Sequence, residues 1–326
     1  MGARPPGRLE TADFLTAQEL YYERGWTDGL PVIPPTPELV EQALGHTPMA
    51  PDDIVGTVPE RRRSITVEKV AINAVMAGCR PEYLPVILAA TAAMCDPAAG
   101  AHGPTASTAG AGLLVIVNGP PVERLGINCG GNVFGPGARA NATIGRAMRL
   151  IIMNCAGAYP GKADRATLGH AGKYSWCIGE DEGDPRWSPL HVERGLRSEQ
   201  GAVTTFFGMS TVQVSEHKSA NPEGIVDAIG RAMLSGGIPR EGPREAVVVI
   251  AGEHRRTIAG AGWTKRDVRN RLFECSPNPP VGEPDDYLII SAGGSGGRFS
   301  AFSLSWGVKP GHVAVTRAVE EATHRS

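Results

Sequence analysis

The apolar residues of this chain recur with helix and strand periods in separate segments. Residues 67–77 and 84–94 are apolar nearly all round, which predicts two helices that are buried on most sides. Residues 144–152 carry one apolar stripe at helical spacing, which predicts a helix with a single buried face. The stripe is formed by Ile144, Ala147, Met148, Ile151 and Ile152. Short apolar runs at 113–117, 203–207 and 211–214 predict strands.

A second and smaller unit is predicted after a proline-rich link. Apolar runs at 246–251, 287–291 and 312–316 predict three further strands, with short helices between the first two. The sequence therefore predicts an α/β fold, with α+β as the alternative, built from mixed sheets and helices. We expect a main domain at residues 1–240 and a small C-terminal α/β module at residues 241–326.

The composition narrows the range of partners. The 326 residues carry a formal net charge of −2 and no basic run, so no nucleic-acid partner is expected. No apolar run approaches the ~18 residues of a membrane span, and the first residues lack the apolar core of a signal peptide. The six cysteines show no CxxC or zinc-type spacing, which predicts free thiols. We expect a cytoplasmic homo-oligomer that acts on a small-molecule substrate.

A glycine-rich loop at residues 125–138 leads into the helix with the apolar stripe. Such a loop offers unpaired N–H groups to an anion, so Gly135 and Gly137 are candidate substrate-binding residues. Cys129 lies on the same loop. Asn141 follows at the edge of the buried face, where it is either a site residue or a helix cap. Neither GxGxxG nor GxxxxGK[ST] occurs, so we expect no dinucleotide and predict no cofactor.

Arginines near the glycine-rich segments have two predicted roles. A second glycine-rich loop, residues 293–298, follows a predicted strand and ends in an arginine, which suggests an anion site with Gly296 and Arg298. Three other arginines lie on the helix that carries the apolar stripe, on the side opposite the stripe, so we expect that side to be a solvated face or an interface. These are Arg139, Arg146 and Arg149.

The segment 159–197 lacks clear periodicity and is rich in reactive side chains. A loop of about forty residues without regular structure is uncommon unless it serves a site or is disordered. Trp176 and Trp187 argue against disorder. We therefore predict that this segment carries the chemistry. Its candidate catalytic residues are Lys173, Cys177, Glu180 and His191.

Several strings carry a resemblance to a known family. They are ERGWTDGLPV at 23–32, NAVMAGC at 73–79, FGPG at 134–137, RANATIGRA at 139–147, GKYSWC at 172–177, GEH at 252–254 and GWTKRDV at 262–268. Together they resemble an uncharacterised bacterial family associated with UGSC selenoproteins and their cysteine counterparts. UGSC proteins are named for a selenocysteine or cysteine in a redox-type motif, and this chain has no UGSC or CGSC string. The resemblance therefore implies a relative or protein partner of a thiol or selenol enzyme.

The first functional hypothesis is an enzyme with a thiol nucleophile, an oxidoreductase or lyase, acting on a small polar and anionic substrate. Cys177 would attack, with its thiolate favoured by Lys173 or His170. Glu180 or His191 would move protons, and residues 135–141 would hold an oxyanion. Acidic neighbours raise a thiol pKa, so Cys129 is the alternative nucleophile.

Two other hypotheses remain open. A metal-dependent lyase or hydrolase would use Glu180, Glu182 and His191 as ligands, with His102 or Cys177 completing the set. A non-catalytic subunit would only position a redox partner. The metal content of the purified protein separates the metal hypothesis from the thiol hypothesis.

Overall fold

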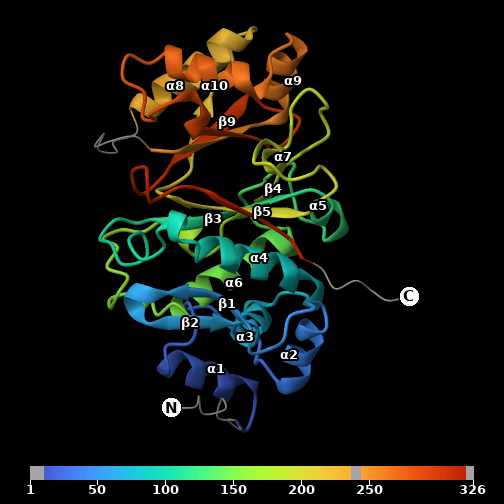
Figure 1. The fold of residues 1–326 in the computed structure, drawn as a ribbon, viewed down its shortest axis with the longest axis vertical. Coiled ribbons are helices and arrows are strands. Elements are labelled where there is room, and N and C mark those ends of the chain that lie inside the picture. Colours follow the sequence, from blue (N-terminus) through green and yellow to red (C-terminus); the bar gives the residue numbers. More distant parts are fainter. Residues whose placement is uncertain (1–10, 236–243, 321–326) are drawn as a thin grey trace.

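Two four-stranded sheets lie face to face at the centre of the molecule, and helices cover the outer face of each sheet (Figure 1). The computed structural model describes residues 11–235 and 244–320. Within them, the first sheet has the order β10-β5-β3-β4 and the second has the order β6-β9-β7-β8. The predicted α/β class, with mixed parallel and antiparallel pairing, is confirmed.

The first sheet contains strands from both ends of the chain. It is formed by β3 (Gly112–Asn118), β4 (Cys177–Gly179), β5 (Ala202–Gly208) and β10 (Val315–Ala318). Its outer face is covered by α3 (Val67–Ala77), α4 (Leu84–Met94) and α6 (Arg139–Asn154). The side chains of β3 alternate strictly, because successive residues of a strand point to opposite faces. Leu113, Val115 and Val117 face these helices, whereas Leu114 and Ile116 face the second sheet.

The second sheet repeats the arrangement of the first. It is formed by β6 (Val212–Ser215), β7 (Ala246–Ile250), β8 (Tyr287–Ser291) and β9 (Phe299–Leu304), and covered by α8 (Pro222–Leu234), α9 (Gly252–Gly260) and α10 (Lys265–Glu274). In the first sheet β3 pairs with parallel β4 and antiparallel β5, and in the second sheet β7 pairs likewise with parallel β8 and antiparallel β9. Apolar side chains of both inner faces form one shared core layer. The result is a helix–sheet–sheet–helix sandwich.

The two halves exchange their edge strands. β6 follows β5 along the chain but pairs with β9, and β10 follows β9 but pairs with β5. Each sheet therefore contains strands from both sides of residue 240, the domain boundary that we expected from the sequence. β6, a strand of the second sheet, and α8, which packs on the outer face of that sheet, both precede that boundary, and β10 returns to the first sheet. The proline-rich link itself lies outside the described residues.

The N-terminal part packs beneath the first layer of helices. It comprises α1 (Phe14–Glu23), α2 (Pro37–Leu44) and the hairpin β1 (Ile54–Val58) with β2 (Arg63–Thr66). Two short helices, α5 (Pro121–Arg124) and α7 (Leu190–Glu193), lie in loops between strands. In the described residues, no helix combines the length and the apolar character needed to cross a membrane.

The arginines of α6 contact other segments of the chain. Arg146 and Arg149 are largely covered, which agrees with the predicted interface, whereas Arg139 is exposed, which agrees with the predicted solvated face. Arg146 donates two hydrogen bonds of 2.8 Å to the carboxylate of Asp28, which joins two of the strings that carry the family resemblance. Arg139 donates to the carbonyl of Gly78, at 3.2 and 3.0 Å. Arg149 pairs with a buried aspartate, as described below.

Candidate functional site

A large opening near the predicted site residues lies at the carboxyl ends of β3 and β4. It is a pocket of about 810 Å³, built from the loop after β3 and the loop after β4. In open α/β sheets, ligands bind outside the carboxyl ends of parallel strands. Four acidic side chains and one thiol contribute to its lining, and these are Glu123, Glu180, Asp181, Glu182 and Cys129. We call it the thiol pocket.

Cys129 lies where the two glycine-rich loops meet. Its carbonyl oxygen accepts a hydrogen bond of 2.8 Å from the backbone N–H of Gly293. The side chain is half-buried, and burial followed by the negative charge of Asp181 raises the pKa of the thiol, although Arg255 opposes this effect. Asp181 is itself paired with Arg255 at 2.7 Å. Cys129 is therefore a protonated thiol at neutral pH, in contact with an acidic pocket.

Cys177 lies in a different environment from the one expected of a nucleophile. Its side chain points from β4 into the core between the first sheet and its helices. Complete burial raises the pKa of this thiol above its usual range. Burial also raises the pKa of Cys79, Cys95 and Cys155 to about 12. These four thiols are protonated at neutral pH; Cys155 accepts a hydrogen bond of 3.3 Å from Asn73, and no lysine is among the groups that act on Cys177.

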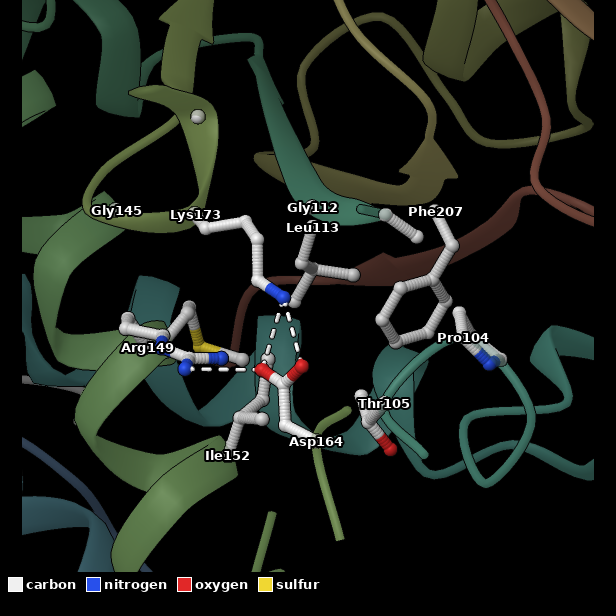
Figure 2. A pocket seen from close by; sticks show the side chains of 13 residues that line it. Pro104, Thr105, Gly112, Leu113, Gly145, Arg149, Ile152, Asp164, Lys173 and Phe207 are labelled. Atoms are coloured by element: carbon white, nitrogen blue, oxygen red, sulfur yellow. Dashed lines mark hydrogen bonds and ion pairs between the residues drawn. The ribbon is translucent and has the colours of Figure 1, made fainter. Parts of the chain in front are cut away.

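Lys173 pairs with Asp164 rather than with a cysteine. Its Nζ lies 2.9 Å from the carboxylate of Asp164, which also accepts a bond of 3.1 Å from Arg149 (Figure 2). Burial is the largest effect on the pKa of Asp164 and raises it, but the hydrogen bonds from Lys173 and the Ala166 N–H, together with the charges of Lys173 and Arg149, outweigh it and the net pKa is lowered. The cavity beside this trio has only about 20 Å³, room for about one water molecule. The trio ties α6 to the following loop and leaves no room for a substrate.

Glu180 is the centre of a buried network that joins the two halves. Its Oε1 accepts from Lys265 Nζ at 2.6 Å and from the N–H of Ser291 at 3.3 Å. Its Oε2 accepts from Asn118 Nδ2 and from the N–H of Leu190, both at 2.7 Å. Glu180 and Lys265 are each 2% exposed. A carboxylate with four donors is positioned to hold the sheets together, which differs from the proton-transfer role that we expected.

Glu182 and His191 are the two residues of the segment 159–197 whose side chains are placed for proton transfer at the thiol pocket. Glu182 Oε1 accepts from Asn118 Nδ2 and from the N–H of Gly119, both at 2.8 Å. His191 Nδ1 lies 3.6 Å from the same oxygen. The ring is 0% exposed, and neither of its nitrogens has a hydrogen-bond partner among the described residues. A carboxylate that lines the pocket thus has an imidazole directly behind it.

Asn141 is neither a cap nor a substrate ligand. Its Oδ1 accepts from the N–H of Asn128 at 2.7 Å. Its Nδ2 donates to the carbonyls of Asn128 at 2.9 Å and Cys177 at 3.0 Å. Helix α6 has Ala138 at its N-cap position, without a side-chain cap. Asn141 therefore connects the first glycine-rich loop to β4, and its polar atoms are used within the fold.

The second glycine-rich loop does not form the expected anion site. Arg298 donates to Glu253 at 2.8 Å and to the carbonyls of His217 and Ser219 at 2.9 and 3.2 Å. These bonds occupy the guanidinium group. The loop instead packs against the first glycine-rich loop, since a Cβ on Gly294 would lie 3.4 Å from Gly131 Cα. Gly135 and Gly296 line a second pocket beside this contact, whereas Gly137 lines neither pocket.

The ligand set of the metal hypothesis is not assembled. In residues 11–235 and 244–320, no group of three His, Cys, Asp or Glu side chains comes together in a way that could hold a metal ion. Glu180 is saturated by its donors, and Cys177 lies in the helix-facing core. The site that the geometry defines contains one thiol and several carboxylates.

Sequence reasoning missed the residues that arrange this site. Asn118 bridges Glu180 and Glu182, Lys265 neutralises Glu180, and Asp181 pairs with Arg255. Asn118 ends an apolar strand, which was an available signal for a residue at a ligand-binding edge. No protein-family model matches this chain, and no curated protein matches it. Fold and site together define an α/β sandwich with a thiol in an acidic pocket.

Proposed function

We propose that this protein is an enzyme that uses the Cys129 thiol on a small polar substrate bound in the thiol pocket. The observation that carries the proposal is the position of Cys129. It is the cysteine that lines this pocket of about 810 Å³, and it shares the lining with the carboxylates of Asp181 and Glu182. Pockets of this size at the ends of parallel strands hold small ligands.

The lining revises the expected charge of the substrate. No lysine, arginine or histidine belongs to it, whereas four acidic side chains do. Glu180 and Asp181 are paired with Lys265 and Arg255 behind the lining, and Glu123 and Glu182 lie outside these two ion pairs. Like charges repel, and they do so more strongly in a partly desolvated pocket. A neutral or cationic substrate therefore fits this pocket better than the anionic substrate expected from the glycine-rich loops.

The chemistry begins with a proton transfer, because the thiol is protonated at neutral pH. The proton passes to a pocket carboxylate such as Glu182, with His191 next in line at 3.6 Å from that carboxylate. The thiolate sulfur then adds to the carbonyl carbon of the substrate, the π electron pair of the C=O bond moves to the oxygen, and that oxygen takes the proton back from the carboxyl group. No second cysteine lines the pocket, so a mixed disulfide to Cys129 would form by attack of its thiolate on a disulfide or selenenylsulfide of another molecule, which releases the other thiolate or selenolate. A UGSC-type partner would fit that role; this partner, the homo-oligomer and the cytoplasmic location remain predictions.

The test compares single serine variants of two half-buried cysteines. Cys275 is the control, since it lies at the end of α10 and outside the thiol pocket. A panel of neutral, cationic and anionic small electrophiles (aldehydes, amides and esters) is followed by NMR with each protein. We expect neutral or cationic compounds to be turned over by the wild type and by Cys275→Ser but not by Cys129→Ser. Turnover that survives in Cys129→Ser, or no turnover of any compound, contradicts the proposal.

A further inference from the structure

A second pocket lies on the other side of the contact between the glycine-rich loops. It has about 360 Å³ and is lined by residues of both loops and of β6, β7 and β9. Its floor is the end of the core layer between the two sheets, formed by Val133, Val249, Ala292 and Ala301. Small side chains at this end of the layer leave space that leucine or isoleucine fills elsewhere. We call it the ring pocket.

Two exposed aromatic side chains line the ring pocket. Phe134 is 36% exposed and Phe299 is 44% exposed, although each borders a well-packed core. Phe134 comes from the first glycine-rich loop, and Phe299 begins β9. Phe299 and Ala301 lie on the same face of β9, since residues two apart share a face. The pocket therefore has an apolar floor with phenyl groups on walls from two different segments.

The lining carries no charged residue. Its polar side chains are uncharged, and they are Asn132 and Gln213. Ser300 reaches the lining with its main chain, because its Oγ bonds to His254 on the other face of β9. Gln213 pairs directly with Ala301 across the sheet, so its amide lies on the same face, at the rim. Burying a charged group without a partner is costly, whereas an uncharged flat ring can contact the phenyl groups and meet an amide at its edge. The chemical character is thus opposite to that of the thiol pocket.

We propose that the ring pocket binds an uncharged planar ring, aromatic or heteroaromatic, with a polar substituent at its edge. The volume lies within the range of small-ligand pockets, and the walls and floor match the apolar faces of such a ring. This site is separate from Cys129, and it does not depend on the reactivity of the thiol. The two glycine-rich loops then separate two binding sites of different chemistry.

The test uses three probes that differ in one property each. Benzamide has a flat ring and an uncharged amide, cyclohexanecarboxamide replaces the flat ring, and benzoate replaces the amide by a charge. Ligand-observed NMR titrations on the full-length protein measure the dissociation constants. We expect benzamide to bind at least fivefold more tightly than either of the other two. Equal binding of cyclohexanecarboxamide, or tighter binding of benzoate, overturns the proposal.

Variants locate the binding. Phe134→Ala and Phe299→Ala are expected to weaken benzamide binding about threefold to tenfold, as the loss of one aromatic contact does. Phe14→Ala is the matched control, because Phe14 is 50% exposed and lies on α1, away from the pocket. Gly296→Leu is a gain-of-volume variant, since a Cβ there meets no atom within 4 Å; it is expected to weaken binding by filling the pocket. Equal effects of Phe14→Ala, no effect of the three pocket variants, or loss of binding after alkylation of Cys129 contradicts the proposal.

Discussion

The side-chain amide of Asn141 forms hydrogen bonds with both the N–H and the C=O of Asn128. Its Oδ1 accepts from Asn128 N at 2.7 Å, and its Nδ2 donates to Asn128 O at 2.9 Å. The same Nδ2 reaches the carbonyl of Cys177 at 3.0 Å. Asn128 directly precedes Cys129, so this pattern fixes the loop that carries the thiol against β4. The geometry of the pocket thus depends on a residue that does not line it.

We predict that Asn141→Ala destabilises the protein by about 3 kcal/mol, because three hydrogen bonds are lost and their backbone partners are left buried. Asn141→Asp is expected to cost more, since a carboxylate oxygen would face the carbonyls of Asn128 and Cys177. Urea unfolding followed by circular dichroism measures both. The control is Asn221→Ala, which removes a true N-cap of α8 and should cost about 1 kcal/mol. An Asn141→Asp variant as stable as the wild type would show that this residue is not a structural bridge.

We predict that the alkylation of Cys129 depends on Asp181. The rate should rise with pH towards a midpoint above the usual range, because burial and the charge of Asp181 raise the pKa of the thiol. Asp181→Asn removes that charge and frees Arg255, so the profile should shift to lower pH. Labelling with iodoacetamide and peptide mass spectrometry give the profile for each cysteine.

Asp184→Asn is the matched control for this shift. Asp184 lies three residues further along and pairs with Arg186 at 2.8 Å. It is not among the charges that act on Cys129. An equal shift in both variants, or no shift in Asp181→Asn, would mean that the local charge does not set the reactivity of the thiol.

We predict that Glu180 and Lys265 are coupled in stability. Lys265→Met leaves the buried Glu180 carboxylate without its ion-pair partner, which costs about 3–5 kcal/mol. Glu180→Gln leaves Lys265 with only the Glu193 carboxylate at 3.8 Å, so its cost should be somewhat smaller. The double variant should recover a large part of this loss, because no uncompensated charge remains. Urea unfolding of the four proteins in a double-mutant cycle gives the coupling free energy. Additive losses would show that the ion pair does not join the two halves.

Local patterns predicted most helices and strands but not their pairing. The helices at 67–77 and 84–94 and the strand at 113–117 follow from apolar periodicity alone, and the structure confirms them. The exchange of β6 and β10 leaves no local signature, because an edge strand has the same sequence pattern in either sheet. Strand pairing between distant segments depends on packing of the whole sandwich rather than on neighbouring residues.

For the candidate site, too, the sequence predicted local features but not the contacts between distant residues. The sequence identified a segment rich in acids and the loop with Cys129, and both line the thiol pocket. It could not show that Glu180 is neutralised by a lysine 85 residues away, or that Lys173 pairs with Asp164 instead of a thiol. A side chain's partner decides whether it is reactive or structural. Partners at such separations become visible only in three dimensions.

The last prediction concerns the stability of the folded protein at acidic pH. Burial lowers the pKa of His170, His254 and His312, and their unfolded-state pKa is about 6.5. Below pH 6.5 the unfolded chain therefore binds protons that the folded protein does not, so acid favours unfolding. The stability contributed by these rings is complete above pH 6.5 and is lost as the pH falls below it.

We therefore expect the urea midpoint to be constant from pH 8 to pH 7 and to fall between about pH 6.5 and pH 5. Paired carboxylates such as Asp28 and Asp164 have lowered pKa values, so their contribution to stability is lost mainly below about pH 5. Burial raises the pKa of Glu245, so this one carboxyl opposes the three histidines within the window. His254→Gln removes one of the three titrating rings and should give a shallower fall over the same window. The midpoint is measured at constant ionic strength for both proteins. A flat or rising wild-type midpoint between pH 6.5 and pH 5 would show that the buried rings take up protons in the folded state as readily as in the unfolded chain.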